Sequence, residues 1–250
     1  MAAHAFLEHS GILAFAHRGD QDSAPENTAS AFGAAVRLGF EYIETDVRAT
    51  ADGVLLIFHD QYLDRLADQS GRIDRMNWSE LRHVRVAGTE PIPRLDEMLE
   101  AFPDIRFNIE PKSDRAVQLL VDIIQHTRAE QRVCVGSFSD QRLRLFRSAL
   151  PDVCTSMGRT ETTKARLYSM GLPLNLGSAA CAQVPPQWRG ISIVDRRFVE
   201  AMKKNDLQTH VWTVNDQKEM NRWINLGVEG LMTDKPAELK KILIARGLWH

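Results

Sequence analysis

Two carboxylates, Glu44 and Asp46, stand two positions apart in the apolar segment 42–47. Side chains on a β-strand alternate between its faces, so a strand here points both carboxylates to the same side. If both faces of the strand are covered, the two groups repel each other and lose hydration, which is costly unless a positive charge lies between them. A divalent cation is the simplest such charge. The pair indicates a metal site if the strand is buried, and a solvated polar face if it lies at the edge of a sheet.

Polar residues also follow two other apolar runs that are typical of strands. His17 and Arg18 come directly after residues 12–16, and Glu110 and Lys112 close a second such run. An apolar run that ends in polar residues is expected for a buried strand that leads into a loop. We therefore predict that these four side chains lie where strands meet their loops.

A hairpin is expected to bring a histidine to the same place. The sequence Ala-Asp-Gly at 51–53 is typical of a turn, and the apolar run 54–58 has the character of the returning strand. Counting an antiparallel pair from residues 51 and 52 places His59 opposite Glu44. Because one bulged residue changes the count, we interpret this only as proximity.

Eight apolar runs alternate with stretches of helical periodicity. The runs cover 12–16, 42–47, 105–109, 133–137, 153–156, 191–194, 209–214 and 229–233, and most are followed by an amphipathic stretch, the first of which has Asn27 or Thr28 as its N-cap. This pattern predicts an α/β fold, the TIM (β/α)8 barrel, as one domain over residues 1–250. A doubly wound sheet is the competing fold, but no Gly-rich dinucleotide turn follows the first run.

In a barrel the carboxyl ends of all strands meet at one mouth, so the polar strand ends are expected to converge. The oxygens of Glu44, Asp46 and Glu110 suit one hard divalent cation, Mg²⁺ or Ca²⁺. Arg18 can neutralise a phosphate through a bidentate fork, and Lys112 can do so as a point charge. This combination indicates cleavage of a phosphodiester.

Two histidines complete the predicted site. His17 and His59 can divide the general acid and general base roles near neutral pH. Trp212, at the end of the seventh run, is a candidate for the substrate wall, and Asn27 is a further candidate for substrate binding. Asp234, which precedes Lys-Pro, is interpreted as a helix cap.

The sequence also resembles the glycerophosphodiester phosphodiesterase family of phospholipase-C-like barrels. The motifs that carry the resemblance are Ala16-His17-Arg18-Gly19, Pro25-Glu26-Asn27-Thr28, Glu44-x-Asp46-Val47, Asp52-Gly53, His59-Asp60-x-x-Leu63-x-Arg65, Ile92-Pro93-x-Leu95-x-Glu97, Glu110-x-Lys112, Trp212-Thr213-Val214-Asn215 and Thr233-Asp234-x-Pro236.

The resemblance implies a TIM barrel with a small insertion after the second strand, here about residues 47–104. It implies hydrolysis of glycerophosphodiesters such as glycerophosphocholine or glycerophosphoethanolamine to sn-glycerol 3-phosphate and an alcohol. By the same resemblance Glu44, Asp46 and Glu110 hold the metal, and His17 and His59 are the acid and the base.

Two alternatives remain open at this stage. A lysophospholipase D places an acyl chain along the apolar loops at 172–174 or 184–188, although these residues also suit ordinary packing. A barrel that binds phosphodiesters without cleaving them is the alternative from another class, and its signature is the loss of a histidine or a metal carboxylate. Neither loss is found in the motifs above.

Composition limits the partners and the compartment. The net charge is −2 without long blocks of like charge, which argues against nucleic acid and a stable membrane insertion and leaves a small-molecule substrate, with a homo-oligomer possible in principle. Residues 1–11 lack the pattern of a signal peptide, and no apolar run reaches about 18 residues. The three cysteines, Cys134, Cys154 and Cys181, are far apart in sequence, so they indicate neither disulfides nor a thiolate metal site. We expect a cytoplasmic enzyme.

Overall fold

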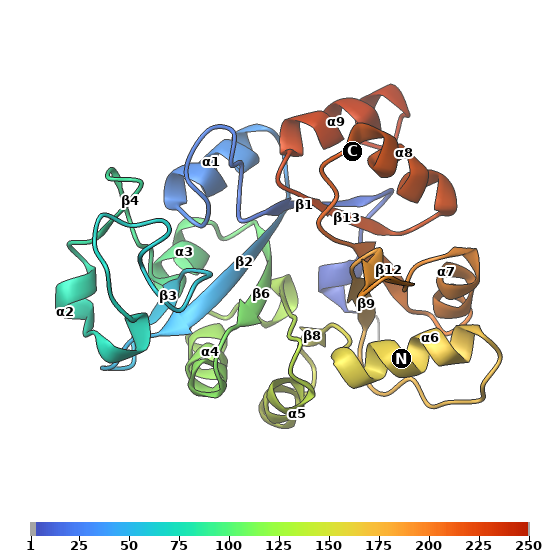
Figure 1. Cartoon of the computed structure of the whole chain (residues 1–250), viewed down its shortest axis with the longest axis horizontal. Helices are drawn as coiled ribbons and strands as arrows, with labels where there is room; N and C mark the ends of the chain where they lie inside the picture. The colour runs from blue at the N-terminus through green and yellow to red at the C-terminus, as the bar shows by residue number, and fades with distance from the viewer. Residues whose placement is uncertain (1–3, 250) are drawn as a thin grey trace.

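Eight parallel strands form a nearly closed barrel with the helices outside (Figure 1). The computed structural model describes residues 4–249, so residues 1–3 of the segment 1–11 discussed above lie outside the described part. In spatial order the strands are β8 (Cys154–Thr155), β7 (Val133–Val135), β6 (Arg106–Pro111), β2 (Tyr42–Ala49), β1 (Leu13–His17), β13 (Gly230–Thr233), β12 (Gln208–Val211) and β9 (Cys181–Val184). A parallel bridge between Ser156 and Cys181 joins the two ends of this order. The predicted TIM barrel is confirmed.

One helix follows each barrel strand along the chain. These helices are α1 (Ala29–Arg37), α3 (Leu95–Ala101), α4 (Asp114–His126), α5 (Asp140–Ala149), α6 (Arg159–Ser169), α7 (Arg196–Lys203), α8 (Gln217–Leu226) and α9 (Pro236–Ala245). In α4 the buried residues Val117, Leu120, Val121 and Ile124 recur every three or four positions, so one stripe of the helix faces the barrel. The Thr28 side chain caps α1 by accepting a hydrogen bond from the Ala31 amide, as the sequence predicts.

The segment between β2 and α3 forms a small subdomain beside the barrel, at the left of Figure 1. Its elements are β3 (Leu55–Ile57), which pairs antiparallel with β2, then η2 (Ile73–Arg75), α2 (Trp78–Leu81), β4 (Arg85–Val86) and β5 (Glu90–Pro91). The subdomain has its own apolar cluster, which includes Phe58, Leu63, Ile73 and Leu81. This apolar cluster stabilises the subdomain, which therefore holds residue 59 and its neighbours beside the mouth of the barrel.

Side chains fill the inside of the barrel. Phe15, Tyr42 and Met232 pack there with Phe6, which comes from η1 (Ala5–Leu7). The Tyr42 hydroxyl donates a hydrogen bond of 3.0 Å to the Phe6 carbonyl. Another short helix, η3 (Glu130–Arg132), precedes β7. The barrel is thus a packed core that closes below the mouth.

The predicted sixth strand at 191–194 is wrong. The sixth barrel strand is β9, whereas β11 (Ile191–Ser192) forms a small exposed hairpin with β10 (Gln187–Trp188). Three residues of the run at 191–194 are β-branched, which gives strand propensity, but Ile191 and Ser192 are exposed, while the segment before Val184 consists largely of small residues. Ala180 and Ala182 are buried all the same. Tertiary packing decides strand formation at both places.

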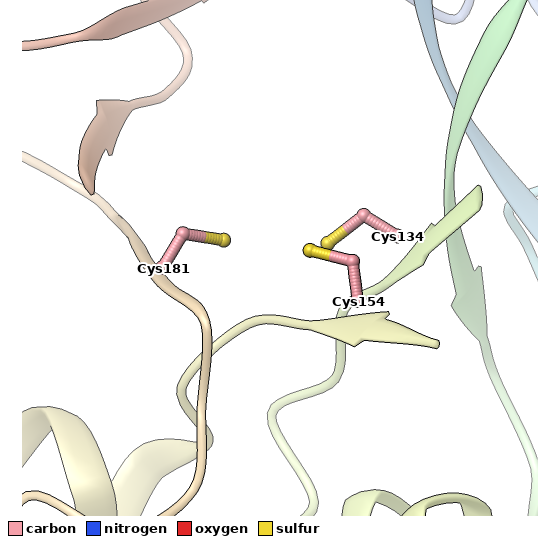
Figure 2. Close-up of side chains that lie close together, drawn as sticks. All are labelled: Cys134, Cys154 and Cys181. Atoms are coloured by element: carbon pink, nitrogen blue, oxygen red, sulfur yellow. The ribbon is translucent and has the colours of Figure 1, made fainter. Parts of the chain in front are cut away.

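The three cysteines, which are far apart in sequence, lie together in space. Cys134, Cys154 and Cys181 lie on β7, β8 and β9 and point toward one another inside the barrel (Figure 2). Their sulfurs all lie within 4.8 Å of one another. Spacing along the chain conceals this cluster because the three strands are brought together only by the closure of the barrel.

Within residues 4–249, no helix has both the length and the apolar character needed to cross a membrane.

Candidate active site

A cavity of about 250 Å³ lies at the carboxyl ends of the barrel strands. All but one of the residues that the sequence predicts for the site line this cavity, namely His17, Arg18, Glu44, Asp46, His59, Glu110, Lys112 and Trp212. The exception, Asn27, is buried behind Asp46. The barrel therefore brings together residues that are separated by almost 200 positions in the sequence.

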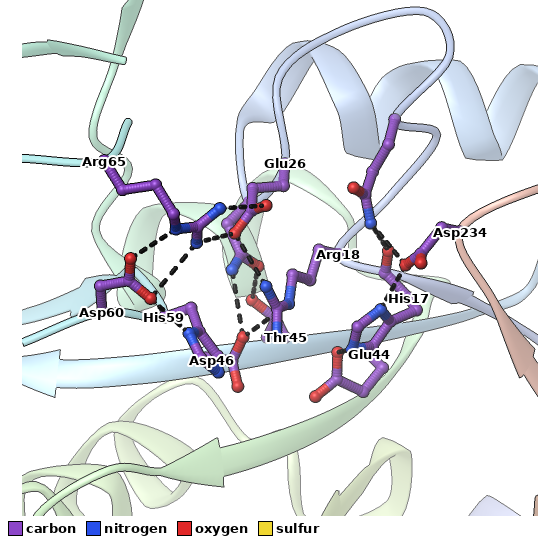
Figure 3. A network of polar contacts seen from close by, with 12 residues as sticks. His17, Arg18, Glu26, Glu44, Thr45, Asp46, His59, Asp60, Arg65 and Asp234 are labelled. Carbon is purple, nitrogen blue, oxygen red and sulfur yellow. Dashed lines mark hydrogen bonds and ion pairs between the residues drawn. The ribbon is translucent and has the colours of Figure 1, made fainter. Parts of the chain in front are cut away.

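His17 ends β1 and lies between two carboxylates (Figure 3). Its Nδ1 is 2.5 Å from Asp234 Oδ1, and its Nε2 is 3.5 Å from Glu44 Oε2. Burial lowers the pKa of the imidazole, but the charge of Glu44 and the hydrogen bond to Asp234 outweigh burial, so the pKa lies above its ordinary value. The Asp234 contact also fixes the orientation of the ring.

The interpretation of Asp234 as a helix cap is wrong. The N-cap of α9 is Lys235, and no side chain caps this helix. Asp234 instead accepts hydrogen bonds from Gln21 at 2.7 Å and Asn215 at 2.7 Å in addition to its contact with His17. β13 pairs with β1 in the closed barrel, so the residue after the last strand lies beside the residue that ends the first.

Asp46 is almost fully buried and is surrounded by cations and one amide. Lys112 Nζ lies 2.7 Å from Oδ1, and Oδ2 is 3.1 Å from Arg18 Nε and 3.2 Å from Asn27 Nδ2. Burial raises the pKa of this carboxyl, but Lys112 and Arg18 outweigh burial and hold the pKa below its ordinary value. Asp46 is therefore ionised at neutral pH.

Glu44 has no comparable partner. Its side chain is buried, and Oε2 accepts no hydrogen bond from any described residue. Burial and then the neighbouring charge of Asp46 raise the pKa of Glu44 to about 7. A buried carboxylate oxygen without a donor is costly, and a cation satisfies it.

Glu110 completes the carboxylate set. The parallel register of β2 and β6 pairs Asp46 with Glu110 and Glu44 with Asn108. Lys112 Nζ is 2.7 Å from Glu110 Oε2, so this ammonium group bridges Glu110 and Asp46. The donor set on the two strands is made of oxygen atoms and includes Glu44 Oε2, which accepts no hydrogen bond from a described residue, so it fits a hard divalent cation.

His59 comes from the subdomain. Its expected proximity to Glu44 is confirmed, since both residues line the cavity, while the count that placed it directly opposite Glu44 is off by one residue. Thr50 and Val54 close the turn, Val47 pairs with Ile57, and the backbone N–H of residue 58 donates to the carbonyl oxygen of residue 46. His59 still lines the cavity. Its charge contributes to the lowered pKa of Asp46, after the larger contributions of burial, Lys112 and Arg18.

A second carboxylate orients His59. Its Nδ1 lies 2.6 Å from Asp60 Oδ1, and Asp60 in turn accepts a hydrogen bond of 2.5 Å from Arg65 Nε. Arg65 also donates to both oxygens of Glu26, which accepts another bond from Arg18 at 2.8 Å (Figure 3). The Arg65 hydrogen bond lowers the pKa of Asp60 to about 2. Each histidine thus has a carboxylate on Nδ1.

Local backbone conformation places Arg18 and Asn27. Both residues have positive φ angles, 61° and 59°. The backbone N–H of Asn27 donates a hydrogen bond of 2.9 Å to the backbone carbonyl of Arg18. The Asn27 side chain also accepts a hydrogen bond from Thr45 at 2.8 Å. These contacts make Asn27 a residue that positions Asp46 and Arg18.

The opposite wall of the cavity is aromatic. The rings of Phe138 and Trp212 meet edge to face at 5.6 Å, and those of Phe138 and Trp188 lie 6.1 Å apart. All three line the cavity. We call Phe138, Trp188 and Trp212 the aromatic wall. The predicted loop at 172–174 does not belong to the lining, whereas Val184 and Pro185 do.

Sequence reasoning missed several residues that orient the site. Glu26, Asp60 and Arg65 occur in the recognised motifs but received no role, and Asp234 received a wrong one. Only Asp234 directly follows a barrel strand, which is a signal that the sequence offers; Glu26 and Arg65 lie in loops and reach the site through Arg18 and Asp60. Asn108 received no role because its position beside Glu44 follows only from the register of β2 and β6.

These observations define a class of protein, a TIM-barrel enzyme with its site at the carboxyl ends of the strands. The model of the glycerophosphoryl diester phosphodiesterase family matches residues 17–238. A probable glycerophosphodiester phosphodiesterase 2 from Mycobacterium tuberculosis is 36% identical over 98% of this chain and 95% of its own length.

Solved structures agree on the fold. A putative glycerophosphoryl diester phosphodiesterase from Silicibacter pomeroyi matches with a TM-score of 0.85 at 22% identity, over 99% of this chain and 100% of its own. A phosphodiesterase from Oleispira antarctica, solved with the product sn-glycerol-3-phosphate, has a TM-score of 0.79 at 23% identity over 94% and 97%. The chain belongs to the glycerophosphoryl diester phosphodiesterase family and is a phosphoric diester hydrolase.

Proposed function

We propose that this enzyme hydrolyses glycerophosphodiesters of small alcohols, such as glycerophosphocholine and glycerophosphoethanolamine, to sn-glycerol 3-phosphate and the alcohol, with a divalent cation bound. The observation that carries the proposal is the pairing of two histidines, each backed by a carboxylate, around buried carboxylates, one of which has an oxygen that accepts no hydrogen bond from a described residue. The product bound by the Oleispira antarctica relative supports the choice of substrate.

Glu44, Asp46 and Glu110 are the proposed ligands of the cation, Mg²⁺ or Ca²⁺. The ion would polarise a phosphate oxygen and lower the pKa of the attacking hydroxyl. The Lys112 ammonium group lines the cavity and forms ion pairs with Asp46 and Glu110. A phosphate bound in the cavity would be the third partner of this ammonium group. The Arg18 guanidinium, which forms ion pairs with Glu26 and Asp46, can contact the same phosphate.

The two histidines perform the proton transfers. One of His17 and His59 removes the proton of the attacking oxygen through its Nε2, and the other donates a proton to the leaving alcohol oxygen as its bond to phosphorus breaks. In both rings the carboxylate on Nδ1 favours the tautomer in which Nε2 is free to exchange a proton. After the reaction the two rings have exchanged protonation states, and water restores them.

The test follows the products of glycerophosphocholine by phosphorus NMR. We expect glycerol 3-phosphate and choline, which means cleavage of the bond between phosphorus and the choline oxygen. Release of choline phosphate and glycerol in their place contradicts the proposal, because it places the leaving group on the wrong side of the phosphate.

The attacking oxygen is either the 2-hydroxyl of the substrate glycerol or a water molecule. Attack by the hydroxyl forms a cyclic phosphate, which water then opens. A substrate analogue that lacks the 2-hydroxyl separates the two routes. Turnover at the normal rate shows direct attack by water, and its loss at unchanged binding shows the cyclic route.

The aromatic wall supports a second candidate function, cleavage of lysophospholipids in the manner of a lysophospholipase D. Trp188 and Phe138 are both 42% exposed, an unusual degree for such large apolar groups, and they border the cavity. If an acyl chain binds there, Trp188→Ala raises the KM for lysophosphatidylcholine and leaves that for glycerophosphocholine unchanged. Equal effects on both substrates contradict this second function.

A further inference from the structure

The three cysteines of the chain form one compact group inside the barrel, below the cavity. Cys134, Cys154 and Cys181 are the only cysteines in the sequence, and each is at most 1% exposed. They extend from three successive barrel strands, and in Figure 2 the Cys181 side chain points across toward the other two sulfurs. All three are free thiols.

The distances between the sulfurs are close to those of a metal site. A tetrahedral Zn²⁺ ion with Zn–S bonds of about 2.3 Å separates its sulfur ligands by about 3.8 Å. The three sulfurs lie within 4.8 Å of one another, so small rotations of the side chains bring them to that spacing. The remaining requirement is a fourth ligand.

His210 on β12 neighbours the group through Cys181, but its ring nitrogens do not lie within 4.8 Å of all three sulfurs, so the ring must move toward them to supply the fourth ligand. The imidazole is fully buried, and its Nε2 lies 3.0 Å from the side-chain oxygen of Gln208. A proton on Nε2 satisfies that oxygen and leaves a lone pair on Nδ1. The Gln183 amide nitrogen is 3.4 Å from this Nδ1 and 4.0 Å from Cys134 Sγ, so the ring and the sulfurs share a neighbour. An outer hydrogen bond to a carbonyl oxygen is usual for a histidine that binds a metal.

The chemistry of the group suits a thiophilic cation. All three sulfurs are buried inside the barrel and lie together. Soft sulfur ligands select ions of the Zn²⁺ class over hard ions such as Mg²⁺ or Ca²⁺.

The position of the group gives the site a structural role. β8 and β9 are the two ends of the barrel sheet, and the isolated bridge between Ser156 and Cys181 joins them. Cys154 is on β8 and Cys181 on β9, so a shared ion links the two strands across the seam. Gly136 and Ser156 lie one layer above Cys134 and Cys154 and line the cavity, so small groups separate the site from the mouth.

We propose that Cys134, Cys154, Cys181 and His210 form a second metal site, which binds one thiophilic cation of the Zn²⁺ class and closes the seam between β8 and β9. The site is independent of the catalytic carboxylates and of the proposed function, since it uses none of their residues.

The test uses Cd²⁺ as the probe, because thiolate ligation of this ion gives a near-ultraviolet charge-transfer band that oxygen ligands do not give. The full-length enzyme is freed of metals and kept reduced, and Cd²⁺ is added both to the folded protein and during refolding. We expect one sulfur-bound equivalent per chain, together with a rise in Tm. X-ray absorption of the Zn²⁺ form is expected to show three sulfur ligands and one nitrogen ligand.

Matched variants locate the ion. Cys154→Ser and Cys181→Ser each remove a ligand, so we expect each to weaken Cd²⁺ binding by more than about 100-fold. Loss of a residue that only supports a ligand costs at most about this factor. Glu44→Gln, which alters the proposed catalytic site, is expected to leave the band unchanged. Wild-type protein that folds and shows no sulfur-bound ion under either loading condition overturns the proposal, and this result does not depend on whether a variant folds.

Discussion

The side chains of His17 and Asp234 meet at 2.5 Å although 217 positions separate them in the sequence. The contact exists because β1 and β13 are neighbours in the closed barrel. It makes His17 part of a pair of the same type as His59 and Asp60, which are adjacent in the chain. The site therefore contains two imidazoles with equivalent support from two unrelated parts of the molecule.

Asp234 is a positioning residue, and Asp234→Asn is expected to lower kcat/KM by about 10²- to 10⁴-fold, the usual contribution of a general acid or base. The variant also loses a carboxylate that raises the His17 pKa, so that pKa is expected to fall. NMR titration of the histidine resonances measures the shift. An unchanged His17 pKa in Asp234→Asn contradicts this account of the contact.

Arg65 supports His59 through Asp60. Arg65→Gln removes the hydrogen bond that lowers the Asp60 pKa to about 2, so this pKa is expected to rise toward its ordinary value. The His59 ring loses a fixed partner, and misplacement of a catalytic group costs as much as about 100-fold in rate. The measurement is kcat/KM beside that of Arg72→Gln, which breaks an exposed pair with Asp74 in the same subdomain. Equal activity of both variants refutes the role of Arg65.

Glu44 is the most informative of the proposed metal ligands because its Oε2 has no hydrogen-bond donor among the described residues. Glu44→Gln keeps the shape and removes the charge, so binding of Mg²⁺ or Ca²⁺ in a calorimetric titration is expected to weaken strongly. Glu41→Gln, which alters the exposed carboxylate just before β2, is the control and is expected to bind as wild type does. Unchanged binding by Glu44→Gln argues against a cation at this site.

Tyr42 provides a test of the barrel interior through pH. Its hydroxyl donates to the Phe6 carbonyl and accepts from Arg106, both at 3.0 Å, so Tyr42→Phe is expected to cost about 1 kcal/mol in the free energy of unfolding. Burial raises the pKa of Tyr42 from 10.0 to about 12. The unfolded chain ionises first, so this contribution is complete below pH 10 and is lost between pH 10 and 12.

Urea unfolding of wild type and Tyr42→Phe below pH 10 and again near pH 12 measures this difference. The gap between the two proteins is expected to narrow at the higher pH. The control is Tyr62→Phe, which removes the hydroxyl of an exposed tyrosine. A constant gap for Tyr42→Phe contradicts the assigned pKa.

The sequence predicts those parts of the fold in which local pattern and burial agree. The helices α5 and α8 follow apolar runs, as the alternation in the sequence predicts, because their apolar stripes are regular. β9 escapes prediction because Ala180 and Ala182 have no strand signal of their own. The Glu44 and Asp46 pair is visible because it follows from alternation within one strand.

Contacts between residues on different strands cannot be predicted from the pattern within one strand. Asp234 resembles a helix cap until the first and last strands are known to be neighbours, and the cysteine cluster depends on three strands in register. The error in the His59 register arises from a single residue in the turn. Each of these misses concerns a contact that only closure of the barrel or pairing of strands creates.

We expect the cavity to hydrolyse glycerophosphodiesters with a bound divalent cation, and with His17 and Glu44 as essential groups. The most direct measurement is release of glycerol 3-phosphate from glycerophosphocholine by wild type, His17→Ala and Glu44→Ala, before and after chelation and after return of Mg²⁺ or Ca²⁺. The account predicts activity in wild type that chelation abolishes and the ion restores, and none in the two variants while they remain folded. Activity that survives chelation and both substitutions contradicts it.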